Sequence, residues 1–182
     1  MDSTMIIVIV VAVILLIGIA IISISNNLNR AIVKIDEASS DIDVALTKRY
    51  DVLTKMMDTV KGFTKHENEI MFNVIKLRSG MSLDEKNEAN KLMDENLKNI
   101  NVVAENYPEL RSSETYVQLQ KAIADVEEHL QASRRIYNAN VSRYNQMIVT
   151  FPTSVIANNK GMTRKNFFEA EASKRDDVKI DL

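Results

Sequence analysis

Residues 5–24 read MIIVIVVAVILLIGIAIISI, and the organisation of the whole chain follows from this stretch. It carries no charge, and only Gly18 and Ser23 fall outside the apolar set. A helix rises about 1.5 Å per residue, so twenty residues cover roughly 30 Å, the thickness of a bilayer's hydrocarbon core. Backbone amides inside lipid need partners within the protein, and a lone span finds them only as a helix. The stretch predicts a single transmembrane helix, with the lipid bilayer as its partner.

Two other interpretations of this stretch are a buried core helix and a cleaved signal peptide. The rest of the chain offers no comparable apolar mass to cover a core helix. A signal peptide has a basic start and an apolar core of about 7–15 residues. Here Asp2 stands where the basic residues should be, and the apolar run is longer. We therefore expect residues 1–25 to remain as an anchor.

Basic residues near a span set its orientation in the membrane. None precedes the span, whereas Arg30 and Lys34 follow it closely. We expect a short external N-terminus and a cytoplasmic C-terminal part.

Composition favours long helices and excludes some functions. The chain of 182 residues carries 23 basic and 25 acidic side chains, a net charge of -2. This balance lacks the basic footprint of a nucleic-acid-binding protein. Four glycines and two prolines leave few tight turns, which favours helices over sheets. We expect a helical bundle over residues 26–151, followed over 152–182 by a turn, a short helix and an extended tail.

The residues after the anchor repeat apolar side chains at heptad spacing, as in coiled coils and bundles. One column contains Ile32, Ser39, Leu46, Leu53, Val60, Glu67, Val74 and Met81, and its partner contains Leu28, Ile35, Ile42, Arg49, Met56, Phe63, Ile70 and Leu77. Thirteen of these sixteen positions are apolar. The seam predicts that the anchor continues as one helix as far as Arg78.

A strip of small residues, Ala31, Ala38 and Ala45, runs beside this seam and would let a neighbouring helix approach closely. Arg49 and Glu67 interrupt the seam, and buried charges need partners. Polar residues at core positions often fix register or oligomer state. These five residues are our candidates for contacts between helices or between copies of the chain.

Two further helices follow, each with a start signal and a stop signal. Ser82 and Glu85 have the spacing of a capping box, and Pro108 ends the second helix. The third helix begins after Ser112 or Ser113 and stops near residues 151–152. Three helices joined by short connections pack antiparallel. We therefore predict an all-α fold, in which the transmembrane helix continues into an elongated antiparallel three-helix bundle.

The sequence contains no recognisable catalytic, cofactor-binding or metal site. His66-Glu67 lacks the second histidine, four residues on, that a zinc protease helix requires. There is no cysteine and no glycine-rich phosphate loop. We expect neither an enzyme nor a small-molecule substrate. An enzymatic alternative would rest on His66-Glu67 alone.

Several stretches closely resemble the LemA family. They are VKIDEASSDIDVALTKRYDVLTKMMDTVKGFTKHENEI at 33–70, NYPELRSSETYVQLQ at 106–120, RRIYNANVSRYNQMIVTFPTSVIA at 134–157, FFEAEA at 167–172 and VKIDL at 178–182. Ser39 departs from the pattern, in which many relatives have tryptophan. The resemblance implies a single-pass protein of a bacterial inner membrane, with an antiparallel helical fold and no catalytic motif. It also implies kinship with proteins associated with membrane-shaping or compartment-forming machinery.

Two functional hypotheses follow. The first is a self-associating helical scaffold that shapes or organises the membrane. The second is a tethered adaptor that presents its bundle to a membrane enzyme or sensor, with Phe167 and Phe168 and the C-terminal tail as the docking element. The alternative for this aromatic pair, which we prefer, is that it caps the open end of the bundle. The predicted partners are a second copy of the chain in the first case and another membrane protein in the second.

Overall fold

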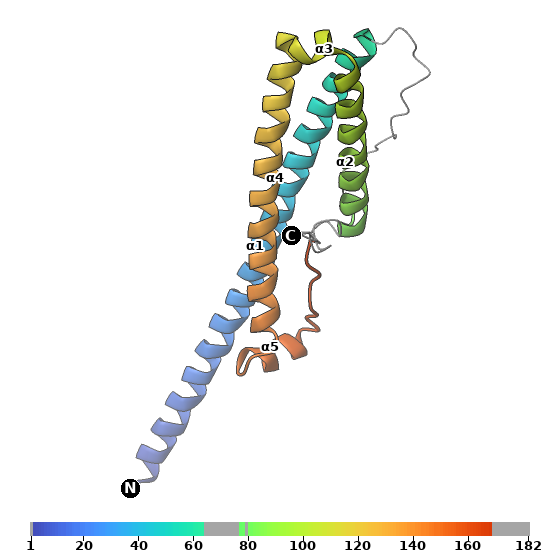
Figure 1. Ribbon diagram of the computed structural model, residues 1–182. Helices are drawn as coiled ribbons and strands as arrows, with labels where there is room; N and C mark the ends of the chain where they lie inside the picture. Colours follow the sequence, from blue (N-terminus) through green and yellow to red (C-terminus); the bar gives the residue numbers. More distant parts are fainter. Residues whose placement is uncertain (1, 64–76, 79, 169–182) are drawn as a thin grey trace, which may run out of the picture. The chain divides into compact units, whose positions relative to one another are not determined.

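The computed structural model describes residues 2–63, 77–78 and 80–168. These residues form five helices and contain no strand (Figure 1). The helices are α1 (Ser3–Phe63), α2 (Leu83–Asn106), α3 (Pro108–Ser112), α4 (Glu114–Met147) and α5 (Thr153–Asn159). The prediction of an all-α fold is confirmed.

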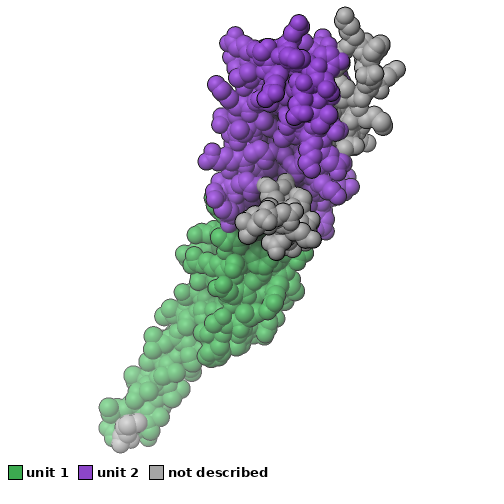
Figure 2. All heavy atoms as spheres, in the orientation of Figure 1, with its two compact units in different colours: residues 1–38, 136–167 green, residues 39–135, 168–182 purple. Residues whose placement is uncertain are grey.

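The chain divides into two compact units, which Figure 2 shows in different colours. Unit 1 comprises residues 1–38 and 136–167, and unit 2 comprises residues 39–135 and 168–182. Helices α1 and α4 each contribute residues to both units. The predicted domain boundaries after residues 25 and 151 stay a prediction.

The first part of α1 is a candidate membrane span. The most apolar 18-residue window of this helix has no buried residue, whereas Leu28 and Ile35, further along it, are fully or almost fully buried. A core helix would bury its apolar side chains against the rest of the protein. The exposure of the window therefore argues against the core-helix alternative.

In unit 1, the end of α4 runs antiparallel to α1. Asn140 Nδ2 donates a hydrogen bond to the carbonyl oxygen of Lys34 at 3.0 Å, and Lys160, beyond α5, donates to Ser25. Val141 and Tyr144 of α4 are buried in this unit, as is Ile148 directly after the helix. As residue numbers increase from Asn140 to Lys160, the neighbouring residues of α1 thus decrease from Lys34 to Ser25.

The segment after α5 is bound to α4 by side-chain hydrogen bonds. The Tyr144 hydroxyl donates to the Thr163 carbonyl at 3.1 Å, and the Tyr137 hydroxyl donates to the Asn166 carbonyl at 3.3 Å. Asn145 exchanges two hydrogen bonds with the backbone of Lys165, both of 2.9 Å. Burial raises the pKa of both tyrosine hydroxyls, so they remain protonated donors at neutral pH.

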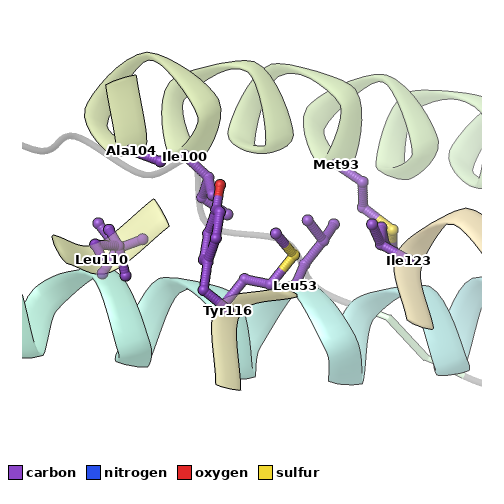
Figure 3. Close-up of a cluster of buried hydrophobic side chains, with 9 residues drawn as sticks. Leu53, Met93, Ile100, Ala104, Leu110, Tyr116 and Ile123 are labelled. Carbon is purple, nitrogen blue, oxygen red and sulfur yellow. The ribbon is translucent and has the colours of Figure 1, made fainter. Parts of the chain in front are cut away.

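Unit 2 is built around apolar side chains from all of its helices. The cluster contains Leu53, Met56, Val60, Met93, Ile100, Ala104, Leu110, Tyr116 and Ile123. In Figure 3, Met93 and Ile100 project from α2 toward the side chains of α1 and α4. The predicted seam of α1 therefore faces the inside of unit 2 at Leu53, Met56 and Val60.

The two predicted start signals are present. Ser82 and Glu85 form a reciprocal capping box at the start of α2, in which the Ser82 N–H donates to the Glu85 carboxylate at 2.7 Å. This bond, the Ser82 hydroxyl and Arg78 lower the pKa of Glu85. Ser113 Oγ accepts a hydrogen bond from the Tyr116 N–H at 3.3 Å at the start of α4.

The prediction that successive helices run antiparallel is wrong for α1 and α2. Lys86, at the start of α2, lies against Ser39 and Asp43, while Asp94 lies against Arg49 further along α1. Residue numbers therefore increase in the same direction along both helices, as the colours of Figure 1 show. Nineteen residues lie between Phe63, the last described residue of α1, and Leu83. The predicted helical course from residue 64 to 76 lies outside the described residues.

We expect Leu53→Ala to lower the free energy of unfolding by about 2–5 kcal/mol, because it leaves a cavity between the helices. Val102→Ala is the matched control, since Val102 is exposed on α2 and its truncation changes stability by less than about 0.5 kcal/mol. Urea unfolding of the detergent-solubilised full chain, followed by circular dichroism, measures both. Equal effects of the two substitutions would contradict this core.

Candidate functional site

A buried arginine joins the helices of unit 2. The Arg49 side chain, on α1, is only 1% exposed. Its Nη1 donates to Asn90 Oδ1 at 2.6 Å and to the Asn90 carbonyl oxygen at 3.2 Å. Its Nη2 forms ion pairs with Asp94 of α2 and Glu127 of α4. We call these four residues the Arg49 cluster.

The Arg49 cluster compensates the cost of burying a charge. A buried cation without a partner is strongly unfavourable, whereas a planar guanidinium can bind two carboxylates and an amide oxygen at once. The two carboxylates are 24% and 32% exposed, so they keep part of their hydration. Asn90 Nδ2 also donates to Asp94 at 3.3 Å, which orients that carboxylate. The cluster therefore acts as a specific link among three helices.

A second buried cation, Lys86, precedes Asp94 by eight residues along α2. Lys86 of α2 donates to Ser39 Oγ at 2.9 Å and pairs with Asp43 at 2.7 Å. Ser39 is the position where the family resemblance leads us to expect tryptophan, and here its hydroxyl accepts a hydrogen bond that tryptophan could not accept. Lys86 and Arg49 together fix the register of α2 along α1.

A third cation packs against one of the two adjacent phenylalanines. The guanidinium of Arg134, on α4, lies 4.7 Å from the ring centroid of Phe168, in the range of a cation–π interaction. Phe168 is 3% exposed, whereas Phe167 is about half exposed. Of this pair, only Phe167 is therefore exposed. The predicted tail after Phe168 lies outside the described residues.

The other predicted packing residues have different surroundings. Ala31, Ala38 and Ala45 are buried, so the close helix approach that they permit occurs within the chain. Glu67 lies outside the described residues, as does His66. A role of the alanines or of Glu67 in contacts between copies stays a prediction.

Sequence reasoning identified Arg49 as a buried charge in need of partners but did not find those partners. Asn90, Asp94 and Glu127 stand among many other polar residues on α2 and α4, and no spacing rule singles them out. Asn90 and Asn96 are buried beside the apolar stripe of α2. That stripe is the only sequence signal that could have directed attention to them.

Outside these clusters, the described residues offer few groups that could bind a metal ion or a ligand. They contain no group of three or more His, Asp or Glu side chains placed to hold a metal ion. A groove of about 740 Å³ in unit 2 is lined by α1 side chains such as Leu46 and Tyr50, and by Leu77, Arg78 and Met81. Arg78 on its rim is paired with Glu85.

Comparisons with known proteins give one consistent result. The model of the LemA family matches residues 38–182. The chain is 32% identical over 158 residues to Protein LemA of Metamycoplasma hominis, an alignment that covers 84% of this chain and 72% of that protein. It is also 29% identical over 66 residues to Magnetosome protein MamQ of Magnetospirillum gryphiswaldense, covering 36% of this chain and 24% of that protein.

We expect Arg49→Ala to lower the free energy of unfolding by about 3–5 kcal/mol, because it leaves Asp94 and Glu127 without their cation. The control is Arg78→Ala, which breaks an ion pair that is 71% exposed on the arginine side and should leave the unfolding midpoint almost unchanged. Denaturant unfolding of both variants provides the comparison. If Arg49→Ala unfolds like Arg78→Ala, the cluster does not hold the helices together.

Proposed function

The chain belongs to the LemA family, and on that premise we propose that it is a non-enzymatic, single-pass protein of the bacterial inner membrane. In this proposal it acts as a self-associating helical scaffold that organises or shapes the membrane. The observation that carries the proposal is α1 itself. This one helix begins with an uncovered apolar window long enough to cross a bilayer and continues into the buried face of a helical protein.

The exposed apolar window supports membrane anchoring on physical grounds. Isoleucine, valine and leucine side chains from Met5 to Ile22 are all at least 45% exposed. A contiguous apolar surface of this size on a protein in water would drive association, whereas in a bilayer it meets a solvent of its own kind. A scaffold that acts on the membrane needs such an attachment.

Basic residues at the end of the span support a cytoplasmic C-terminal part. Arg30 and Lys34 follow the span in the sequence, and Lys160 joins them in space, because it donates to Ser25. An excess of Lys and Arg on one side of a span favours the cytoplasmic side. The folded part of the chain is then inside the cell in this proposal.

Self-association needs a surface that the chain leaves uncovered. From Leu28 to Val60, the seam of α1 and the alanines beside it are buried or partly buried, and the charges of the Arg49 cluster are compensated within the chain. The span is uncovered, and nothing lies within 4 Å of where a side chain at Gly18 would begin. Small residues let helices approach closely in lipid, so in this proposal copies meet through the span around Gly18.

The similarity to MamQ supports a role in organising membranes only as far as its name goes, since that protein is named a magnetosome protein. The resemblance stated from the sequence points to the same kind of machinery. The adaptor alternative has less support, because Phe168 is buried against Arg134 and only Phe167 remains exposed for docking.

The orientation is tested by protease digestion of a C-terminal epitope tag in intact and in permeabilised spheroplasts. We expect the tag to survive in intact spheroplasts and to be cleaved after permeabilisation. A tag at the N-terminus is the control and should be cleaved already in intact spheroplasts. Cleavage of the C-terminal tag in intact spheroplasts would reverse the proposed topology.

Self-association is tested by light scattering of the detergent-solubilised chain over a range of concentrations. We expect a mass larger than one copy, and a lower mass for Gly18→Leu, whose side chain separates the spans. Ile22→Leu, which keeps volume and hydrophobicity, is the control and should behave as the native chain. A strict monomer at every concentration would refute the scaffold.

A further inference from the structure

The end of α4 and α5 form an exposed apolar turn in unit 1. Phe151 is 80% exposed, more than any other large apolar side chain among the described residues. Val149 and Val155, on either side of it, are each more than half exposed. Three such side chains within seven residues form an uncovered surface that the fold of unit 1 does not use.

This turn lies beside the point where the apolar span ends. Lys160 Nζ, directly after α5, donates to Ser25 Oγ and lies 3.5 Å from Asn29 Oδ1, and Ser25 follows the last apolar residue of the span. Gly161, with φ of +65°, closes α5, and the Met162 N–H donates to the Ala157 carbonyl at 3.0 Å. This helix end holds Lys160 in place.

Helix geometry gives the same position independently. Asn140 is bonded to the Lys34 carbonyl, and α4 runs antiparallel to α1 in unit 1. From Asn140 to Val149, α4 and the turn after it advance about 14 Å, and α1 covers about the same distance from Lys34 back to Ser25. Val149 and Ser25 therefore lie at the same level along α1.

The ionised side chains around the α4–α5 turn are positively charged. Residues 136–167 contain four basic side chains and no aspartate or glutamate. The basic residues are Arg143, Lys160, Arg164 and Lys165, all of them exposed. On α1, Arg30 and Lys34 add two more, and Asp36 and Glu37 lie further from the span. Such a surface attracts anionic phospholipid headgroups.

We propose that the α4–α5 turn is a second membrane contact. Phe151, Val149 and Val155 insert into the interfacial layer of the leaflet where the span ends, and Lys160, Arg164 and Lys165 lie among the headgroup phosphates. The inference rests on the proposed function, in which residues 5–24 span the bilayer.

The lipid surface is the occupant that the observations favour. The turn is level with the end of an apolar span, so a bilayer crossed by that span reaches the turn without any further component. Apolar side chains flanked by basic residues are the pattern of elements that lie in the membrane interface. The two attachments also differ in kind, since one spans the bilayer and the other rests on its surface.

The chain contains no tryptophan, so a single introduced tryptophan is an unambiguous reporter of depth. Three variants of the full chain, Phe151→Trp, Leu15→Trp and Ile136→Trp, are reconstituted in vesicles of phosphatidylcholine and phosphatidylglycerol with brominated acyl chains. Ile136 is the matched control, because it lies in unit 1, is about half exposed, and precedes Val149 by about 20 Å along the chain's helical rise.

We expect bromine to quench Phe151→Trp and Leu15→Trp strongly and to leave Ile136→Trp almost unquenched. Quenching of Phe151→Trp should weaken when phosphatidylglycerol is omitted. If Leu15→Trp is quenched and Phe151→Trp behaves like Ile136→Trp, the second contact is refuted and the anchor stands. If Leu15→Trp itself is not quenched, the proposed anchor fails, and the second contact fails with it.

Discussion

The guanidinium of Arg49 is the constraint on which the arrangement of unit 2 depends. A full positive charge inside a protein is tolerated only when anions and hydrogen-bond acceptors surround it. Here they come from Asn90 and Asp94 of α2 and from Glu127 of α4, while Arg49 itself belongs to α1. Apolar packing alone would permit the helices to slide or to reverse, because leucine, isoleucine and methionine interchange at modest cost. A buried charge with two fixed counter-charges permits only one register, and Lys86 repeats the constraint two turns earlier.

The sequence was sufficient for some features and insufficient for others, for physical reasons. The apolar span, the buried face of α1 and the caps at Ser82 and Ser113 depend on residues close together in the chain, and these predictions agree with the structure. The direction of α2 depends on contacts between residues more than forty positions apart, such as Arg49 with Asp94. Heptad spacing shows which face of a helix is buried but not which helix covers it. The partners of Arg49 and the burial of Phe168 could not be predicted either, because they too depend on contacts between residues far apart in the chain.

Because the seam of α1 is covered within the chain, a surface that contacts partners has to lie elsewhere. An uncovered apolar seam would have been a surface for other helices, as the sequence suggested. In the structure the seam from Leu28 to Val60 is covered within the chain, and the exposed apolar side chains of the described residues gather on the span and in the turn around Phe151. Both face the membrane in the account given above. In this proposal, the chain directs its internal charges to its own folding and its exposed apolar groups to lipid.

The most direct test of this account measures the direction of α2 along α1. The chain has no cysteine, so pairs of spin labels can be placed at exposed positions without background and their distances measured by electron paramagnetic resonance. The parallel register predicts short distances for the pairs Asp41–Asp84 and Asp58–Val102. It predicts a long distance for Asp41–Val102, because these two residues are separated by about 25 Å along the helix axis. A short Asp41–Val102 distance together with a long Asp41–Asp84 distance would mean that α2 runs the other way, and would contradict the role assigned to Arg49.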